Sequence, residues 1–231
     1  MKRTNPRAHP PLTRERALEA AIELADTGGI EAVTMRRLAQ ALGVEAMSLY
    51  YHVANKDAVL DGMVDIIFGE IVLPPTDSPD WRESMRERAQ SMREVILSHP
   101  WAMQIMESRT SPGQATLRHH NAVIGCLRHS GFSVPLAAHA FSLMDAYVFG
   151  FVLSEVNLPF DASTSAAEME QMVEGILSTF PDEDYPHLME MTSEHVLTPD
   201  YSYGAEFTFG LTLILDGLEG HLQEHLHRDR R

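Results

Sequence analysis

Hydrophobic residues recur every three or four positions along most of the chain, which is the pattern of amphipathic helices. In the segment 13–28, one stripe is formed by Leu18, Ala21, Ile22 and Ala25. Similar stripes predict helices over about 58–73, 81–98, 101–107, 114–129, 134–156, 165–180 and 204–225. No run alternates between apolar and polar positions as a half-buried strand does. The sequence therefore predicts an all-α fold.

The segment 34–52, with the sequence TMRRLAQALGVEAMSLYYH, predicts two short helices joined by a tight turn. Thr34 can cap the first helix, because its hydroxyl can accept a hydrogen bond from a free amide of the first turn. Gly43 can adopt a positive φ, which ends that helix and turns the chain. The apolar face resumes on a second helix over about 45–51. This pattern is typical of a helix-turn-helix, whose second helix lies in the major groove of DNA.

The outward face of this segment carries side chains that can donate hydrogen bonds to phosphates or base edges, and few acids. They are Arg36, Arg37, Ser48, Tyr50, Tyr51, His52 and Lys56. A helical hairpin without a DNA role would need only the apolar positions. The polar face therefore favours double-stranded DNA as a partner over a purely structural hairpin.

The charge is distributed unevenly along the chain. The formal net charge of −15 would argue against nucleic acid if it were uniform. Residues 1–60 hold eight Lys and Arg against seven Asp and Glu, whereas the remainder holds ten against twenty-six. The acidity thus belongs to the C-terminal part, and it would direct the N-terminal part toward DNA.

Cysteine content and hydropathy favour a soluble, cytoplasmic protein. The single cysteine, Cys126, excludes an internal disulfide. No N-terminal apolar stretch resembles a signal peptide. The most apolar segment, 146–153, is too short to span a bilayer, which requires about 20 apolar residues. We therefore expect no membrane partner.

The block from Gly29 to Asp61, GIEAVTMRRLAQALGVEAMSLYYHVANKDAVLD, closely resembles the DNA-binding domain of tetracycline-repressor-type (TetR family) regulators. The resemblance implies an N-terminal three-helix helix-turn-helix domain at 12–57 and a larger helical ligand-binding and dimerisation domain at 58–231. Residues 1–11 would form a mobile basic arm, either frayed or laid in the minor groove. Repression is the usual mode of action in this family.

Within the larger domain, the resemblance implies that the helix 58–73 is a connection. It links the DNA-binding domain at 12–57, here called the DNA head, to the remaining helices of the chain, here called the body. Tilting of this helix by a bound effector would change the spacing of the DNA heads. The segment 157–203, rich in Asp, Glu and Pro, reads as a variable and partly mobile excursion.

The resemblance also assigns roles in DNA binding. Arg36 would reach a base or a phosphate, and Thr34 would bond a phosphate as well as cap its helix. Base edges would be contacted by Ala46, Met47 and Ser48, and the DNA backbone by Tyr50, Tyr51, His52 and Lys56. Tetracycline repressors proper carry Gln-Pro at Ala46-Met47. Gln can read adenine bidentately, whereas Ala and Met offer only apolar contact, so the operator should differ.

The predicted body is rich in Met and aromatic residues, which suit an adaptable ligand pocket and equally an ordinary core. The candidate ligand-binding residues are Arg88, Met92, Trp101, Met106, Arg109, His120, Phe141, Met144 and Asp145. A buried carboxylate such as that of Asp145 needs a partner. It would either form a structural pair with a His or Arg or orient a ligand, and the sequence leaves both open.

The effector predicted from these residues is a small, largely apolar organic molecule, and no cofactor or metal is expected. Alignment with tetracycline repressors puts Met106 and Ala146 at metal-binding His positions and Ser154 at a Glu that binds a metal-bound water. All three coordinating functions are missing, which argues against magnesium-bound tetracycline.

A homodimer would let two recognition helices read two half-sites of a palindromic operator. The helix 134–156 and the last helix could supply a four-helix interface, or could simply fill the core of one chain. The stretch FTFGLTLILDGLEGHL resembles the dimerisation helix of the family. The candidate dimerisation residues are Gly150, Phe207, Gly210, Leu211, Ile214, Gly217 and Leu218.

Two other functions compete with an effector-responsive regulator. One is a DNA-binding protein that responds to no effector. The other is a zinc hydrolase, because His221 and His225 match the pattern H-x-x-E-H. Only six residues follow His225, so no third ligand lies downstream, and the enzyme is the weaker hypothesis.

Overall fold

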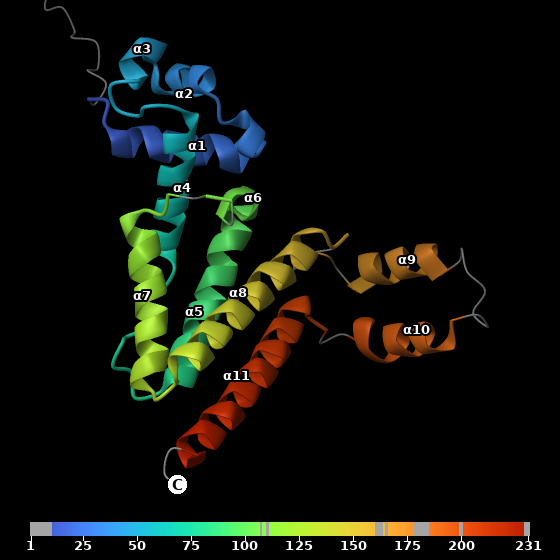
Figure 1. Cartoon of the computed structure of the whole chain (residues 1–231). Coiled ribbons are helices and arrows are strands. Elements are labelled where there is room, and N and C mark those ends of the chain that lie inside the picture. Colours follow the sequence, from blue (N-terminus) through green and yellow to red (C-terminus); the bar gives the residue numbers. More distant parts are fainter. Residues whose placement is uncertain are drawn as a thin grey trace, which may run out of the picture. The chain divides into compact units, whose positions relative to one another are not determined.

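The computed structural model describes residues 11–106, 108–109, 111–159, 164, 166–177, 185–198 and 201–228 (Figure 1). Over these ranges every regular element is helical, which confirms the all-α prediction. The chain divides into two compact units, Met1–Phe149 and Gly150–Arg231. The arm predicted at 1–11 lies, apart from Pro11, outside the described residues.

The first helices form the predicted helix-turn-helix. Helix α1 spans Arg14–Gly28, the short 3-10 turn η1 Ile30–Ala32, α2 Met35–Leu42 and α3 Ala46–Leu49. The hydroxyls of the predicted cap Thr34 and of Thr13 accept from the amides three residues ahead, each at 3.2 Å. Gly43 has φ 67° and ψ 32°, a left-handed conformation that ends α2 and begins the turn.

Helix α3 is shorter than the predicted segment 45–51. The amide of His52 bonds the carbonyl of Leu49, three residues back, so the chain tightens into a turn after Leu49. Tyr50 and Tyr51 therefore lie on this turn, after the recognition helix and not within it.

Helix α4 spans Lys56–Glu70 and joins the DNA head to the body, because it packs against both α1 and helix α7 (Gln114–His129). Asn55 caps it, with Oδ1 accepting from the amide of Ala58 at 2.8 Å. The sequence placed its end at Pro74-Pro75, but the backbone is already extended at Ile71. Helix α4 also approaches α1 closely at Gly62, where an added Cβ would lie 2.7 Å from the methyl carbons of Leu18.

The rest of the first unit is built from α5 (Trp81–Ser98), η2 (Pro100–Ala102), α6 (Met103–Met106), α7 and α8 (Val134–Val156). Helix α8 begins in this unit and continues into the second. The bounds of α5, α7 and α8 agree with the sequence prediction. The predicted helix 101–107 is instead a 3-10 turn followed by the four residues of α6, because Pro100 starts the segment and the α-helical part begins only at Met103.

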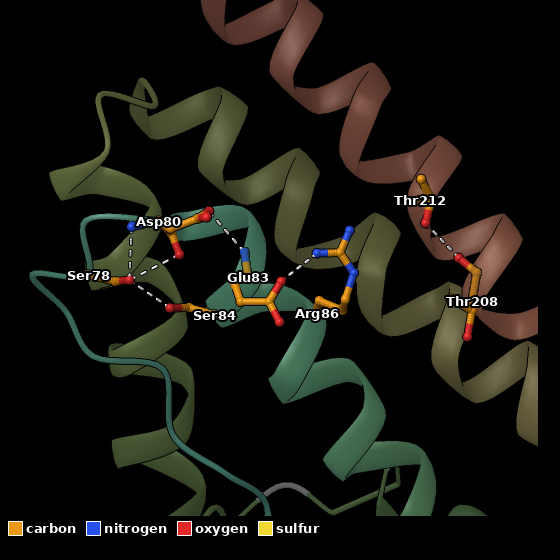
Figure 2. A network of polar contacts seen from close by, with 7 residues as sticks. All are labelled: Ser78, Asp80, Glu83, Ser84, Arg86, Thr208 and Thr212. Carbon is orange, nitrogen blue, oxygen red and sulfur yellow. Dashed lines mark hydrogen bonds and ion pairs between the residues drawn. The ribbon is translucent and has the colours of Figure 1, made fainter.

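A polar network fixes the start of α5 (Figure 2). Asp80 Oδ1 accepts from the amide of Glu83 at 3.1 Å, and the hydroxyl of Ser84 donates to that of Ser78 at 2.7 Å. Arg86 pairs with Glu83 at 2.8 Å. The Asp80 carboxylate thus caps a free amide of the first turn, and the two side-chain contacts hold the residues around the start of α5 together.

Helix α8 differs from its prediction. Its composition is apolar on all sides, and we expected it to be deeply buried. The buried residues form only one stripe, namely Ala137, Ala140, Met144, Val148 and Val152. Leu143 and Leu153 are 47% and 56% exposed, so an apolar face stays uncovered in the single chain. By length and composition alone, α8 is long and apolar enough to cross a membrane, but the core helices of soluble proteins meet the same two criteria.

The second unit contains α9 (Ala166–Leu177), α10 (Pro186–Met191), a π-helical turn (Thr192–Val196) and α11 (Tyr203–Arg228). The sequence predicted α9 but not α10, which lies in the segment 157–203 that reads as a variable excursion. Helix α10 begins at Pro186, and Pro suits the first position of a helix. His195 of the π-helical turn lies 2.7 Å from Glu206 of α11. Figure 2 also shows a bond within α11, in which the Thr212 hydroxyl donates to the Thr208 carbonyl.

The start of α7 depends on a carboxylate from α4. Gly113 precedes α7 and offers no side chain to cap it. Asp65 Oδ1 instead accepts from the amide and the hydroxyl of Thr116, at 2.9 and 3.1 Å. A Cβ on Gly113 would lie 2.1 Å from Asp65 Cγ, so glycine leaves the space that this carboxylate occupies.

We expect Gly113→Ala to lower the free energy of unfolding by about 1–3 kcal/mol, because the methyl group would displace the capping carboxylate. Urea unfolding followed by circular dichroism measures this. Gly69→Ala is the matched control on α4, because its Cβ would meet only Ala115 at an ordinary 3.7 Å. Equal stability of the two variants would show that Asp65 does not need the space at Gly113.

Candidate functional site

The residues predicted to bind DNA share one exposed region of the N-terminal helices. All ten are exposed: Thr34, Arg36, Arg37, Ala46, Met47, Ser48, Tyr50, Tyr51, His52 and Lys56. Met47 and Tyr51 are 71% and 87% exposed although they are large and partly apolar. Large exposed side chains beside cationic ones are characteristic of an interaction surface.

A cavity of about 620 Å³ lies within the first unit, between α4, α6, α7 and α8. Its wall consists of Asp61, Val64, Phe68, Met106, Arg109, Ser111, Pro112, Thr116, His120, Phe141, Ser142, Asp145, Ala146 and Phe149. This volume is typical of sites for small organic molecules. Three of the rings lie edge to face: His120 is 5.5 Å from Phe68 and 5.2 Å from Phe141.

Five of the nine predicted ligand-binding residues line this cavity: Met106, Arg109, His120, Phe141 and Asp145. Met92 and Met144 do not, because they are fully buried in the helical core. The sequence missed the α4 residues of the wall. This helix was predicted only as the connection between the DNA-binding domain and the rest of the chain, so Asp61, Val64 and Phe68 were not assigned to a ligand site.

Trp101 also lies outside the cavity wall and instead joins the body to the DNA head. Its Nε1 donates to Asp26 Oδ1 of α1 at 2.6 Å, and His99 Nδ1 lies 2.7 Å from the same oxygen. The other ring nitrogen of His99 is 3.5 Å from Glu70 at the end of α4.

Arg88 is fully buried behind the cavity wall. Its Nη2 donates to Asp145 Oδ1 at 2.5 Å, and its Nε donates to His119 Nε2 at 3.2 Å. Asp145 therefore has the structural partner that the sequence left open, and it also faces the cavity. Its possible role toward a ligand stays a prediction.

His119 is neutral in the folded protein. Burial, with a smaller effect from the charges of Arg88 and His120, lowers the pKa of His119 to about 3. Because Nε2 accepts from Arg88, the proton of the neutral ring is on Nδ1. Among the described residues, neither this Nδ1 nor Arg88 Nη1 has a hydrogen-bond partner.

Arg109 connects the cavity wall to the first turns of α4. Its Nε donates to Asp61 at 2.6 Å and its Nη2 to Asp57 at 3.1 Å. Burial opposes the charge of Arg109, but the hydrogen bonds that it donates to Asp57 and Asp61 outweigh this effect and raise the pKa of the guanidinium. A single side chain thus contacts both the cavity and the helix that follows the DNA head.

The structure offers no metal site where tetracycline repressors carry one. Met106 and Ala146 line the cavity, and the Ser154 hydroxyl bonds the carbonyl of Gly150. His221 lies 3.8 Å from Glu224 on the exposed side of α11. Within the described part of the chain, no group of three His, Cys, Asp or Glu is placed to hold a metal ion.

The predicted dimerisation residues do not share one surface. Phe207, Leu211 and Leu218 are buried within the single chain, Gly210 and Ile214 are half-buried, and Gly150 and Gly217 are exposed. Phe209 and Leu213 are instead the large apolar residues that α11 exposes. The sequence missed Phe209 and Leu213 because the stripe that is buried in the structure has the stronger helical periodicity. This buried stripe contains Leu215, where the prediction had Ile214.

We expect acid to destabilise the protein through His119. In the unfolded chain this ring takes up a proton near pH 6.5, whereas the folded protein resists until about pH 3. Its contribution is therefore complete above pH 6.5 and is lost as the pH falls. Between pH 5.5 and 4.5 the wild type should lose about 1.4 kcal/mol more than His119→Gln, which keeps an acceptor for Arg88.

Urea unfolding at each pH measures this difference. His139→Gln is the control, because His139 of α8 is exposed, and it should keep the slope of the wild type. Parallel slopes for the wild type and His119→Gln would contradict a neutral, buried His119.

Two protein-family models match the chain. The model described as bacterial regulatory proteins, tetR family, matches residues 17–63, which contain the helix-turn-helix. The model described as tetracyclin repressor-like, C-terminal domain, matches residues 73–222, which contain most of the cavity wall.

Individual relatives agree with these matches. An HTH-type transcriptional regulator from Saccharopolyspora erythraea is 37% identical over 149 residues, which are 64% of this chain and 63% of the relative. The HTH-type transcriptional repressor DrrR1 of Streptomyces coeruleorubidus is 32% identical over 91% of this chain and 78% of its own. The crystal structure of ActR from Streptomyces coelicolor in complex with actinorhodin has a TM-score of 0.72 at 29% identity, over 92% of this chain and 99% of ActR. The chain therefore belongs to the TetR family of transcriptional regulators.

Proposed function

We propose that this regulator is a repressor that binds a palindromic operator as a homodimer and leaves it when a small, largely apolar organic molecule enters the cavity. The observation that carries the proposal is Arg109, which lies on the cavity wall and is bonded to Asp57 and Asp61 of α4. A ligand that displaces this side chain would shift α4 and the DNA head with it.

The DNA-binding part of the proposal rests on exposed residues of α2, α3 and the following turn. Ala46, Met47 and Ser48 on α3 would meet base edges in the major groove. Arg36 and Lys56 would contact the duplex on either side of α3. Met47 is largely exposed, and it would favour a thymine methyl at its position.

The dimer would be formed by uncovered apolar faces of α8 and α11. Leu143, Gly150 and Leu153 fall on one face of α8 by helical spacing. On α11 the exposed residues Phe209, Leu213 and Gly217 recur every four positions. An added Cβ at Gly150 or Gly217 would meet nothing in the same chain, so a partner helix could approach closely there.

The effector part of the proposal rests on the cavity and is favoured over a DNA-binding protein without an effector. A cavity of this size with an aromatic wall is the usual environment of a bound organic molecule. The related ActR was solved with actinorhodin, which supports an organic ligand for this chain as well. Tetracycline held by magnesium is disfavoured because the side chains of Met106 and Ala146 offer no ligand that magnesium prefers. The proposed site of action is the cytoplasm, without membrane, cofactor or enzymatic activity.

For DNA recognition, we expect Arg36→Ala to lower operator affinity by about 1–3 kcal/mol and Lys56→Ala to weaken all sequences alike, with a salt slope reduced by about 1. The operator would be selected from random duplexes, and fluorescence anisotropy at several salt concentrations would compare it with scrambled DNA. Arg118→Ala removes an exposed cation of α7 and is the control. Equal losses on both DNAs for Arg36→Ala would contradict its role in base recognition.

For the effector response, we expect Arg109→Gln and Asp61→Asn each to reduce effector-driven release, because each breaks the contact between the cavity wall and α4. Coupling between two sites is typically about 1–3 kcal/mol, and these variants should lose most of it. Effectors would be found by thermal-shift screening of aromatic compounds, with tetracycline plus magnesium as the counter-probe.

Two quantities are measured for each variant. One is the effector concentration at which half of the operator DNA is released, and the other is the affinity of the DNA-free protein for the effector. Arg118→Gln, which removes a charge away from the cavity, should respond as the wild type does. Unchanged release by Arg109→Gln would refute the proposed transmission, and a strong magnesium-dependent tetracycline shift would refute the class of effector.

A further inference from the structure

We infer that the cavity selects a neutral aromatic molecule with a hydroxyl group, and that Asp145 is the residue that accepts the hydrogen bond from this hydroxyl. This inference rests on the proposed function, because it names the class of effector and the residue that recognises it. It follows from three properties of the cavity wall, namely the pairing of its charges, the chemistry of its free acceptor positions and its aromatic surface.

The charges on the wall are already paired. Asp61 is bonded to Arg109 at 2.6 Å, and Asp145 is bonded to the buried Arg88 at 2.5 Å. A ligand carboxylate would face these two carboxylates, and a ligand ammonium would face the Arg109 guanidinium, with Arg88 behind the wall. Burying an additional, unpaired charge carries a large desolvation cost. A neutral ligand is therefore favoured over either ion.

Asp145 retains capacity to bind a ligand. Its side chain is 18% exposed and lies on the cavity wall, and only Oδ1 is used by Arg88. The guanidinium stabilises the negative charge of this carboxylate, and an ionised carboxylate can accept hydrogen bonds but cannot donate them. The ligand group that meets it must therefore be a donor. A neutral donor on an otherwise apolar molecule is most simply a hydroxyl.

The aromatic wall indicates the rest of the ligand. Phe68, His120 and Phe141 form a continuous edge-to-face series, and Phe149 adds a further ring to the wall. Flat aromatic molecules pack well against such surfaces. Phe141 also lies next to the pair of Arg88 and Asp145, because the Arg88 guanidinium carbon is 6.0 Å from its ring centroid. The aromatic surface and the hydrogen-bond acceptor therefore lie close enough for one small molecule to use both.

The test uses four probes with one ring system: 2-naphthol, 2-methoxynaphthalene, 2-naphthoate and 2-naphthylmethylammonium. Calorimetric titration of the full-length protein at pH 7 would give the affinity of each. We expect 2-naphthol to bind about tenfold or more tightly than the other three, because only it is a neutral donor and a hydrogen bond to a charged acceptor has this magnitude. Equal affinities for 2-naphthol and its methyl ether, or stronger binding of either ion, would overturn the inference.

Asp145→Asn should reduce the preference for 2-naphthol over 2-methoxynaphthalene to below about threefold, because the charged acceptor is gone. Phe141→Leu is the matched variant on the same helix: it should weaken both probes and leave their ratio unchanged. A preserved preference in Asp145→Asn would assign the recognition to another residue and overturn the inference. If Asp145→Asn does not fold, Asp145→Glu serves instead; it keeps the charge and should retain the preference for 2-naphthol. The ranking of the four probes on the wild type is an independent test that needs no variant.

Two further measurements separate this inference from the proposed function. Met106→Trp would fill part of the cavity and should abolish binding of 2-naphthol; undiminished binding would place the probe elsewhere and overturn the inference. Anisotropy of labelled operator DNA reports on the function separately. A protein that ranks the four probes as expected but never binds duplex DNA would refute the proposed function alone.

Discussion

Helix α4 contributes to two different cores, and this constraint governs the rest of the molecule. One side of the helix packs against α1, with Gly62 allowing the methyl groups of Leu18 to come close. Another side packs against α7 and supplies Asp61, Val64 and Phe68 to the cavity wall. Protein cores are close-packed and respond to strain by discrete repacking. In the proposed mechanism, a change of the cavity wall on α4 would therefore reach the DNA head without any additional element.

The polar contacts of the body are better understood as positioning devices than as sources of stability. The free energy that a buried ion pair gains from the attraction of its charges is largely offset, because both charges lose their hydration. Arg88 nevertheless joins α5 to α7 and α8 through His119 and Asp145, and Arg109 joins the segment before α7 to α4. Each contact fixes one helix relative to another around the cavity. The cavity thus keeps its shape even though it leaves part of the core unfilled.

Local signals in the sequence were sufficient for most of the helical architecture. Thr34 and Gly43 fix the ends of α2 by their own chemistry, and the bounds of α7 follow from apolar periodicity. The residues proposed to face DNA could be selected because they lie on the exposed side of the helix-turn-helix. The sequence also predicted one ligand site for Met106 of α6, Arg109 before α7, His120 of α7, and Phe141 and Asp145 of α8. That grouping required the family resemblance as well as the residue types.

The remaining features depend on contacts between distant positions. Arg88 and Asp145 are far apart in sequence, so their pairing cannot be read from periodicity. The same holds for the neutral state of His119, which results mainly from burial among distant residues. Met92 and Met144 have the composition of pocket residues but lie in the core, because side-chain type does not reveal which side of a helix faces a cavity. Phe209 and Leu213 were overlooked for a related reason. An exposed apolar face interrupts the alternation of apolar and polar positions, so it cannot be recognised in the sequence as a second apolar stripe.

The contact at Asp26 has a mechanical consequence. The ring nitrogens of His99 and Trp101 both meet one oxygen atom of this carboxylate, Oδ1. Two contacts that converge on a single atom resist translation but oppose rotation only weakly. In the proposed mechanism, the DNA head would therefore pivot near the end of α1, and α4 would act as the lever. A small swing of that lever would turn the recognition helix out of register with a groove and leave the hinge contact unbroken.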